Sequence, residues 1–422
     1  MIPMKERIRK INDSLYAVKT LIKWLFLGTF IGFLVGSVCS IFGHMLIWAN
    51  DYRTSHQWIS WFLPIGGLLI VFMYYTWNNE DDKGTNTVIS SIHSNTGIRT
   101  RMAPLIYVST MITHFLGGSA GREGAAIQLG GSIANRVGKE LALNENDQRI
   151  IIMCGMSAGF SALFGAPMAA AIFSLEVISI GIMHYSALVP CVTASMTAHF
   201  LATFLHVKPE AFTVASIPEF SPVIFVKIIV FAALAGGVSV LFCICLHQTG
   251  HFYKKYIKNR YLRIFVGGCL ILILCAVLGT NEYLGSGQGI MEHIFHYEQT
   301  EWYSFLLKMV FTALTLGAGF KGGEIVPSFC IGAAFGCTVA AIFGLPITLV
   351  AACGMVGVFC GVTNCPITSL LISFELFGFE GMPYYLTTVV VSYMLSGYYG
   401  LYHSQKIMYS KTETNFVNRE VK

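Results

Sequence analysis

Two glutamates in glycine-rich stretches are the residues of this sequence best suited to ion chemistry. Glu123 lies in the stretch GGSAGREG at 117–124, and Glu324 lies in the stretch GAGFKGGEIVP at 317–327. Apolar segments flank both stretches, and an acid inside an apolar membrane segment is too costly to be kept without a function. A carboxyl group placed there can carry a proton and, when ionised, can compete with an anion for a binding site. We therefore expect Glu123 to gate an anion path and transfer protons, and Glu324 to relay protons.

A third glycine-containing segment, KGTNT at 83–87, also precedes a helix-like stretch. The start of a helix exposes unpaired N–H groups and the positive end of its dipole, and glycine lets backbone amides approach a ligand closely. Several helix starts that converge inside a membrane form an anion site. Glycines also allow helices to pack closely, which is the alternative for any single segment. From the three segments we expect an anion site built by Gly84, Thr85, Gly121, Arg122, Gly124, Phe320, Gly323, Ile325 and Val326.

Each residue of this set also has a purely structural alternative. Arg122 could draw anions to the entrance of the path or form a structural ion pair. The Thr85 hydroxyl could bind the anion or cap a helix, and Glu324 could pair with Lys321. The apolar residues could line the site or pack against other helices. His114, a single histidine before the second glycine-rich stretch, is expected to be a packed residue.

The elements that must position these residues occur twice in the sequence. Residues 154–177 (CGMSAGFSALFGAPMAAAIFSLEV) match residues 353–376 (CGMVGVFCGVTNCPITSLLISFEL) without a gap. Duplicated apolar halves that are interrupted by glycine and proline are typical of transporters built from internal repeats, which bind their substrate between the repeats. Glu176 and Glu375 occupy matching positions, and we expect structural or vestibule roles for them.

The composition independently predicts a membrane protein. Hydrophobic residues make up 55% of the 422 residues and charged residues 12%, whereas soluble domains carry about 25% charged residues. The runs long enough to cross a bilayer are 21–48, 60–76, 186–206, 222–246 and 262–279. The shorter runs, which we expect to be broken helices that meet inside the protein, are 103–118, 124–136, 149–164, 166–180, 305–317, 327–343, 346–362 and 366–378.

Charge and hydropathy divide the chain into five parts. We expect a cytoplasmic N-terminal arm (1–19), a first membrane repeat (20–206), a linker (207–221), a second membrane repeat (222–405) and a cytoplasmic tail (406–422). Both termini are rich in Lys and Arg, which favours the cytoplasmic side of a multi-pass protein of the cell membrane. The net charge of +5 comes mostly from such segments, so it indicates membrane topology and not nucleic-acid binding.

Enzymatic and metal-binding functions are not indicated. The twelve cysteines are scattered through apolar segments without a CxxC pair, which is typical of small buried side chains. The sequence has no HExxH motif, no paired membrane aspartates and no Ser/His or Ser/Lys pair at a useful helical spacing. We therefore expect no enzyme, no metal and no cofactor. A scaffold or sensor without transport activity would leave the two acids unexplained.

The glycine-rich motifs resemble those of the CLC family of chloride channels and anion/proton antiporters. GREG at 121–124, the third glycine-rich segment with its final Pro327, and the paired helices with a later proline carry the resemblance, which covers nearly the whole chain from about residue 20. It implies an all-α membrane fold of two inverted-topology repeats, whose broken helices meet at a midplane anion site. It also implies a homodimer in the lipid bilayer with one pathway per subunit, and a Tyr402 hydroxyl that contacts the anion at an inner gate.

Departures from the chloride pattern resemble the fluoride/proton antiporter branch of this family. Chloride members usually have serine where Thr85 stands and proline where Ala125 stands, and their third segment lacks the acid Glu324. The inner glutamate of proton-coupled chloride members would fall at Val177. The resemblance therefore implies export of fluoride in exchange for protons, with Glu324 in place of the missing glutamate. A chloride/proton antiporter or a passive chloride channel on the same fold is the alternative.

Overall fold

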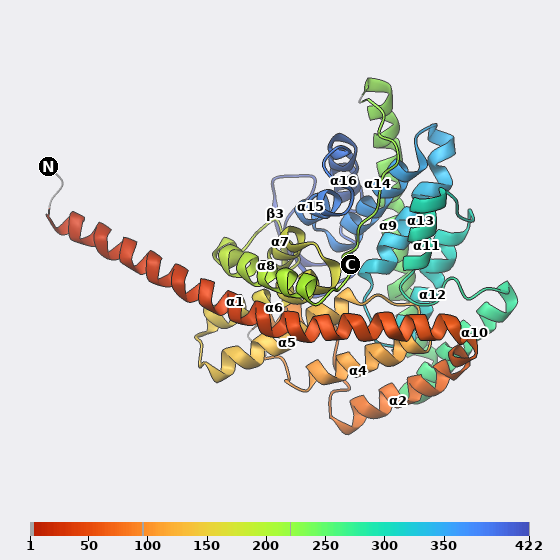
Figure 1. The fold of residues 1–422 in the computed structure, drawn as a ribbon, viewed down its shortest axis with the longest axis horizontal. Coiled ribbons are helices and arrows are strands. Elements are labelled where there is room, and N and C mark those ends of the chain that lie inside the picture. The colour runs from red at the N-terminus through yellow and green to blue at the C-terminus, as the bar shows by residue number, and fades with distance from the viewer. Residues whose placement is uncertain (1–3, 95–96, 220, 422) are drawn as a thin grey trace.

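The computed structural model of the chain describes residues 4–94, 97–219 and 221–421. Residues 1–3 of the expected N-terminal arm, residue 220 of the expected linker and residue 422 of the expected tail lie outside the described residues. The fold is dominated by helices, and the two halves of the chain pack against each other. Helix α2 (Leu63–Thr76) packs on α10 (Arg260–Leu278), and α7 (Pro167–Glu176) packs on α15 (Pro366–Phe377) (Figure 1).

The first half begins with a helix of 52 residues, α1, whose N-terminal part projects beyond the other helices (Figure 1). Because α1 is continuous, the structure has no break at residue 20, where the expected arm would join the first repeat. The helices of this half are α1 (Met4–Ser55), a 3-10 helix (Gln57–Phe62), α2 (Leu63–Thr76), α3 (Thr85–Ser94), α4 (Met102–Phe115), α5 (Glu123–Glu140), α6 (Glu145–Phe164), α7 (Pro167–Glu176), a 3-10 turn (Tyr185–Ala187) and α8 (Leu188–Phe204).

The second half follows the segment 205–221, which the structure describes without helix or strand apart from residue 220. Its helices are α9 (Pro222–Tyr256), α10 (Arg260–Leu278), α11 (Gln288–Tyr297), α12 (Ser304–Ala318), α13 (Ile325–Phe343), α14 (Ile347–Thr363), α15 (Pro366–Phe377) and α16 (Met382–Leu395).

The sequence repeat becomes a structural repeat, in which α4 to α7 correspond to α12 to α15. Local chemistry explains the repeated break: α6 ends at Gly165 and α14 at Asn364, both in the left-handed conformation that ends helices. Pro167 and Pro366 then occupy the first helical position of α7 and α15, where the missing N–H costs nothing. The predicted broken helices are thereby confirmed.

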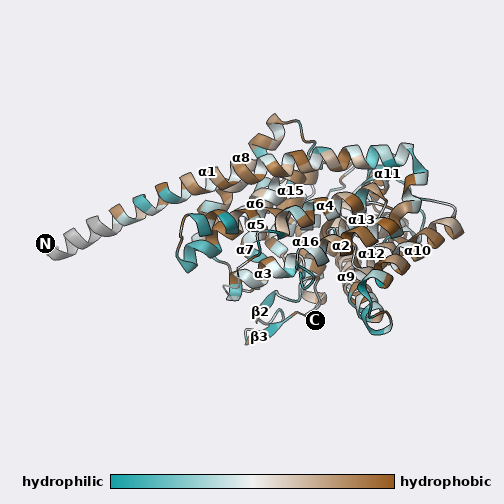
Figure 2. Ribbon diagram, turned by 90° about the horizontal axis from the view of Figure 1, so that it is seen from below, coloured by the Kyte–Doolittle hydropathy of each residue, from teal (hydrophilic) through white to brown (hydrophobic). Residues whose placement is uncertain are grey.

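Six helical stretches of the described residues are long and apolar enough to cross a membrane: Ser14–Ser55, Gln57–Thr76, Tyr185–Phe204, Pro222–Tyr256, Arg260–Leu278 and Ile325–Phe343. Five of them overlap the predicted spanning runs; runs 186–206 and 262–279 extend one or two residues beyond the helix ends. The sixth, α13, was expected among the shorter segments, but it has 19 residues because Pro327 lies within its first turn, where proline is tolerated. Much of the helical region is brown and therefore hydrophobic, whereas strands β2 (Lys406–Tyr409) and β3 (Phe416–Glu420) are largely hydrophilic (Figure 2).

The expected all-α fold holds for the membrane repeats, and the tail adds a small sheet to it. Strand β2 (Lys406–Tyr409) pairs in parallel with β1 (Ser179–Ile180) and antiparallel with β3 (Phe416–Glu420). Ile180, Ile407 and Val421 form a small apolar cluster under this sheet. The tail is therefore a hairpin that is anchored to the segment between α7 and α8.

The repeat-related acids Glu176 and Glu375 tie the two halves together by capping each other's helices. The Glu176 carboxylate accepts hydrogen bonds from the backbone N–H groups of Ile367 (3.0 Å) and Thr368 (2.9 Å), at the start of α15. The Glu375 carboxylate accepts hydrogen bonds from the N–H groups of Met168 (2.8 Å) and Ala169 (2.9 Å), at the start of α7. Carboxylates at helix N-termini satisfy unpaired amides and interact favourably with the helix dipole. The expected structural role of both acids fits this geometry.

Removing one of these caps should destabilise the protein. We expect Glu176→Gln to lower the free energy of unfolding by about 1–3 kcal/mol, because charge-assisted hydrogen bonds to buried amides are lost. The measurement is thermal melting of the detergent-solubilised protein, with the exposed Glu301→Gln as a control that leaves the midpoint unchanged. Unchanged melting of Glu176→Gln would show that these caps contribute nothing.

Candidate anion and proton site

A cavity of about 1240 Å³ contains five of the residues predicted for the anion and proton site. Gly84, Thr85, Phe320, Glu324 and Tyr402 all line it. They come from the start of α3, the turn before α13 and the loop after α16, which are far apart in the sequence. The convergence of these segments supports the expectation of one shared site.

The start of α3 is held by an acid that the sequence analysis missed. The Asp82 carboxylate accepts hydrogen bonds from the Gly84 N–H (3.1 Å) and the Thr87 hydroxyl (3.0 Å). Gly84 has φ +65°, which favours glycine at this tight approach to the helix. Thr85 is the first residue of α3, and its hydroxyl oxygen accepts a hydrogen bond from Gln128 Nε2 (3.3 Å). An acid two residues before a glycine at a helix start was the signal for Asp82 in the sequence.

Four buried polar atoms on the cavity wall have no hydrogen-bond partner among the described residues. They are the hydroxyls of Tyr74 and Tyr402, Gln128 Oε1 and Asp82 Oδ2. Buried polar atoms are normally paired, so unpaired ones in a cavity indicate a ligand or water. Tyr402 was predicted to contact the anion. Gln128 was not predicted, although a glutamine one turn into the helix after GREG was a visible signal.

Glu324 lies on the cavity wall directly before α13, where it occupies the N-cap position. Its alternative role, as partner of Lys321, does not match the geometry. Lys321 Nζ lies 3.9 Å from Asp82 Oδ2 and 4.3 Å from the centre of the Tyr74 ring. Lys321 is thus engaged with Asp82 and Tyr74, and Glu324 presents its carboxylate to the cavity.

The glycine-rich stretches of the two repeats cross each other in direct backbone contact. Gly121 and Gly323 exchange two hydrogen bonds of 2.7 Å each, as in a short antiparallel bridge. A Cβ added at Gly323 would lie 2.6 Å from the Gly124 nitrogen, so no other residue fits there. These three glycines therefore serve the close-packing alternative, and that packing brings the starts of α5 and α13 together.

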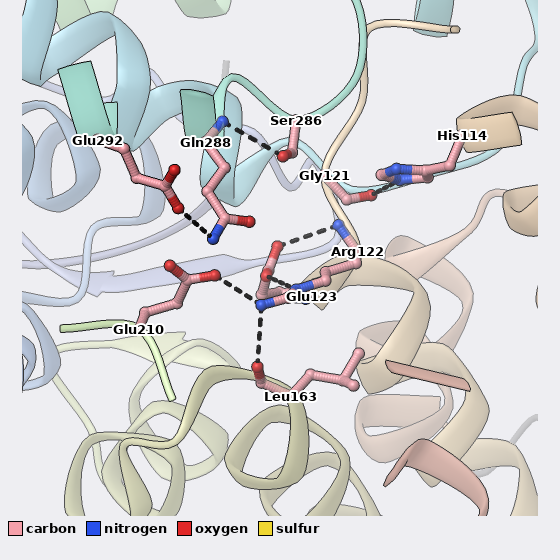
Figure 3. A network of polar contacts seen from close by, with 9 residues as sticks. All are labelled: His114, Gly121, Arg122, Glu123, Leu163, Glu210, Ser286, Gln288 and Glu292. Carbon is pink, nitrogen blue, oxygen red and sulfur yellow. Dashed lines mark hydrogen bonds and ion pairs between the residues drawn. The ribbon is translucent and has the colours of Figure 1, made fainter. Parts of the chain in front are cut away.

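The carboxylate of Glu123 is turned toward Arg122 and is not part of the cavity wall. Glu123 is fully buried, and its carboxylate accepts hydrogen bonds from the Arg122 N–H (3.1 Å) and from Arg122 Nε (3.3 Å). Arg122 Nη2 also donates to Glu210 (2.6 Å), which comes from the linker (Figure 3). Arg122 thus occupies the structural ion pair considered as its alternative role, and the sequence analysis missed Glu210 because nothing near it marks it.

The remaining predicted residues lie behind the cavity wall. Ile325 and Val326 are buried and are not among the residues that line the cavity. His114 is buried, and its Nε2 lies 3.2 Å from the Gly121 carbonyl oxygen, as expected for a packed histidine.

Basic side chains surround part of the cavity. Lys254, Arg260 and Arg263 line it, together with the acids Glu80 and Asp81. Arg260 forms ion pairs with Glu80 (2.6 Å) and Asp81 (3.4 Å), which join the α2–α3 loop to the start of α10. The wall thus carries charges of both signs, and cations on it such as Lys254 and Arg263 attract anions electrostatically.

Comparisons with known proteins agree with this geometry. The family model for voltage-gated chloride channels matches residues 66–397. A chloride/fluoride channel protein of Pseudomonas syringae pv. tomato is 36% identical over 396 residues, which cover 92% of this chain and 87% of the relative. The H⁺/Cl⁻ exchange transporter ClcA of Vibrio cholerae is 24% identical over 403 residues, which cover 87% of this chain and 84% of the relative.

Solved structures show the same fold. A CLC-type fluoride/proton antiporter superposes with a TM-score of 0.89 at 35% identity, covering 92% of this chain and 98% of that one. A slow cyanobacterial Cl⁻/H⁺ antiporter superposes with a TM-score of 0.77 at 19% identity, covering 88% of this chain and 94% of that one, which shows the fold alone. The duplicated broken helices, the glycine crossing and these matches together place the chain in the CLC family, the family of voltage-gated chloride channels.

Proposed function

We propose that this multi-pass membrane protein exports fluoride in exchange for protons. The observation that carries the proposal is the pair of carboxylates on either side of the Gly121–Gly323 crossing, Glu123 against Arg122 and Glu324 in the cavity. A path that must pass both an anion and a proton needs titratable groups at each side of its narrow point. The similarity to a structure described as a fluoride/proton antiporter supports fluoride as the anion.

The cavity side is proposed to be cytoplasmic, because the basic residues Lys254, Arg260 and Arg263 line it. Hydrogen fluoride enters acidified cells as a neutral molecule, dissociates and leaves the anion trapped inside. An exchanger that admits protons uses their gradient to drive the anion out.

Fluoride binding requires hydrogen-bond donors that replace its tightly held water. We propose that the Tyr402 and Thr85 hydroxyls supply them, since the Tyr402 hydroxyl is unpaired among the described residues and the Thr85 oxygen accepts from Gln128. Ile325 and Val326 are proposed as apolar walls of the path beyond the end of the cavity.

Proton transfer is assigned to the two acids. Glu123 is proposed to leave Arg122 on protonation, and in its ionised form to compete with the anion for the path. Val177 stands where proton-coupled chloride members have their inner glutamate, and valine cannot carry a proton. Glu324 is therefore proposed to exchange the proton with the cytoplasmic cavity. The alternative function is a chloride/proton antiporter or a passive chloride channel on the same fold, which the H⁺/Cl⁻ exchange relative keeps open.

The assembly and orientation are proposed from the family resemblance and the charge distribution. We propose a homodimer in the cell membrane, with a separate path in each subunit and both termini in the cytoplasm. The cytoplasmic termini agree with the basic residues of α1 and of the C-terminal hairpin.

The selectivity experiment tests the proposed function directly. We expect purified protein in liposomes to release fluoride at least about tenfold faster than chloride, a difference of about 1.4 kcal/mol, and to take up protons only with fluoride. An anion electrode and a pH electrode record the two fluxes, with protein-free liposomes as control. Equal release of both halides would favour the chloride antiporter, and anion release without proton uptake would favour a channel.

A further inference from the structure

The linker between the repeats contributes a carboxylate to the gate. Glu210 lies 88 residues from Arg122 in the sequence, and Arg122 Nη2 donates a 2.6 Å hydrogen bond to its Oε1. Both side chains are largely buried, with relative exposures of 8% for each residue. Figure 3 shows the Arg122 guanidinium between the Glu123 and Glu210 carboxylates. A connecting segment that places a buried acid on the gate arginine has more than a linking role.

The position of Glu210 is fixed by the backbone around it. The Glu210 N–H donates to the Phe164 carbonyl (3.3 Å), where α6 ends. Gly165, with φ +78°, faces the linker so closely that an added Cβ would lie 2.4 Å from Pro209 Cβ. Further along, the Phe212 N–H donates to the Leu376 carbonyl (3.1 Å). The linker is thus attached to both repeats on either side of the gate.

A buried guanidinium needs a compensating carboxylate at every stage of transport. If Glu123 were its only partner, protonation or movement of Glu123 would leave Arg122 as an unpaired buried charge, which costs several kcal/mol. Glu210 keeps an ion pair with Arg122 while Glu123 leaves. Its negative charge also weakens the hold of Arg122 on the ionised form of Glu123.

We infer that Glu210 is a positioning residue for the gate, a fixed counter-ion that shares Arg122 with Glu123 and so allows Glu123 to take up its proton and move. The inference rests on the proton-carrying role proposed for Glu123. Other charged or titratable groups lie near Arg122, Glu123 and Glu210. His114 on α4 contacts the Gly121 carbonyl, Lys308 on α12 donates to Ser119, and Glu292 on α11 lies near Glu210. Glu324 and Tyr402 lie on the cavity side. Glu210, by contrast, pairs directly with the guanidinium that also holds Glu123: Arg122 Nη2 lies 2.6 Å from Glu210 Oε1, and Arg122 Nε lies 3.3 Å from Glu123 Oε1.

The first test is the pH profile of transport. Glu210→Gln leaves Glu123 as the only carboxylate on Arg122, so Glu123 is held more firmly in its ionised form. We expect the pH of half-maximal proton uptake to fall by about one unit, the lower end of the effect of a charge at contact distance. Glu210→Asp is expected to restore the wild-type profile, and Glu219→Gln, an exposed acid of the same linker, to leave it unchanged. A wild-type profile for Glu210→Gln would overturn the inference.

The second test needs no transported ion. Either carboxylate alone can compensate Arg122, so Glu123→Gln and Glu210→Gln should each lower the melting temperature only slightly. The double variant leaves the guanidinium unpaired, and we expect a loss larger than the sum of the two single losses, which Arg122→Gln should reverse. Additive losses, or failure of Glu210→Gln alone to fold, would contradict the sharing of Arg122.

The two tests separate this inference from the proposed function. If the wild-type protein moves chloride and protons, the pH profile is measured with chloride and tests Glu210 in the same way. If the wild-type protein moves no protons, the proposed function fails, while the melting experiment still decides whether Glu123 and Glu210 share Arg122.

Discussion

Replacing Glu123 with glutamine is expected to abolish proton-coupled exchange. Glutamine has the size of glutamate and can still accept a hydrogen bond from Arg122 Nε, so the start of α5 should keep its shape. The amide cannot take up or release a proton, and it cannot compete with the anion as a tethered charge. We expect proton uptake driven by a fluoride gradient to fall at least about 100-fold, which is the usual size of a lost proton-transfer group.

The measurement is proton uptake by proteoliposomes under an imposed fluoride gradient, with fluoride flux recorded in the same sample. Glu219→Gln is the matched control, since it removes an acid of the linker that is exposed. Fluoride flux is expected to persist or rise in Glu123→Gln because the gate no longer closes as an anion. Wild-type proton uptake in a folded Glu123→Gln protein would show that another group carries the proton.

The second large effect is expected at Glu324. Replacing Glu324 with alanine removes an acid from the cavity wall, while Lys321 keeps its contacts with Asp82 and Tyr74. We expect coupled proton uptake to fall about 10- to 100-fold, less than at Glu123, because water in the cavity can replace part of a relay. The fold should survive, since the Glu324 side chain makes no capping hydrogen bond at the start of α13 and forms no ion pair in the part of the chain that the structure describes.

Glu176→Gln provides the contrast to this variant. Its carboxylate caps α15, so we expect the change to reduce stability and to leave the coupling ratio of folded protein unchanged. The comparison is made on samples with equal amounts of folded protein, as judged by size-exclusion chromatography. Normal coupling in Glu324→Ala together with lost coupling in Glu176→Gln would reverse the two assignments.

Local chemistry explains why so much of the fold could be predicted from the sequence. Helix ends at Gly165 and Asn364, followed by proline at the next helix start, depend on the conformational preferences of single residues. The spanning runs depend on length and apolar composition, which are additive along the chain. The repeat was visible in the sequence itself, and it predicted that α4–α7 and α12–α15 are corresponding helices of the two repeats. The length of α13 was underestimated because a proline inside the first turn looks, in a sequence, like a helix start.

The candidate site was predictable only in part. Glu123, Glu324 and Thr85 stand out because acids and hydroxyls next to glycines in apolar sequence are rare. Gln128 gave a weaker signal, as a polar residue one turn into the helix after GREG, and its contact with Thr85 appears only in the structure. Nothing near Glu210 marks it in the sequence, and its importance follows from its contact with Arg122.

The sequence by itself determined the membrane class, the duplication, the helix breaks and the acids, because these follow from composition, periodicity and the backbone preferences of glycine and proline. Only the tertiary structure decided which charges meet. Arg122 could have faced solvent, and it pairs instead with an acid 88 residues away. Lys321 could have paired with Glu324, and it lies against Asp82 instead, which leaves the acid to the cavity. Which charged side chains pair depends on how segments far apart in the sequence approach one another, as Gly121 and Gly323 do in their backbone bridge. The conformational preferences of single residues do not determine such approaches.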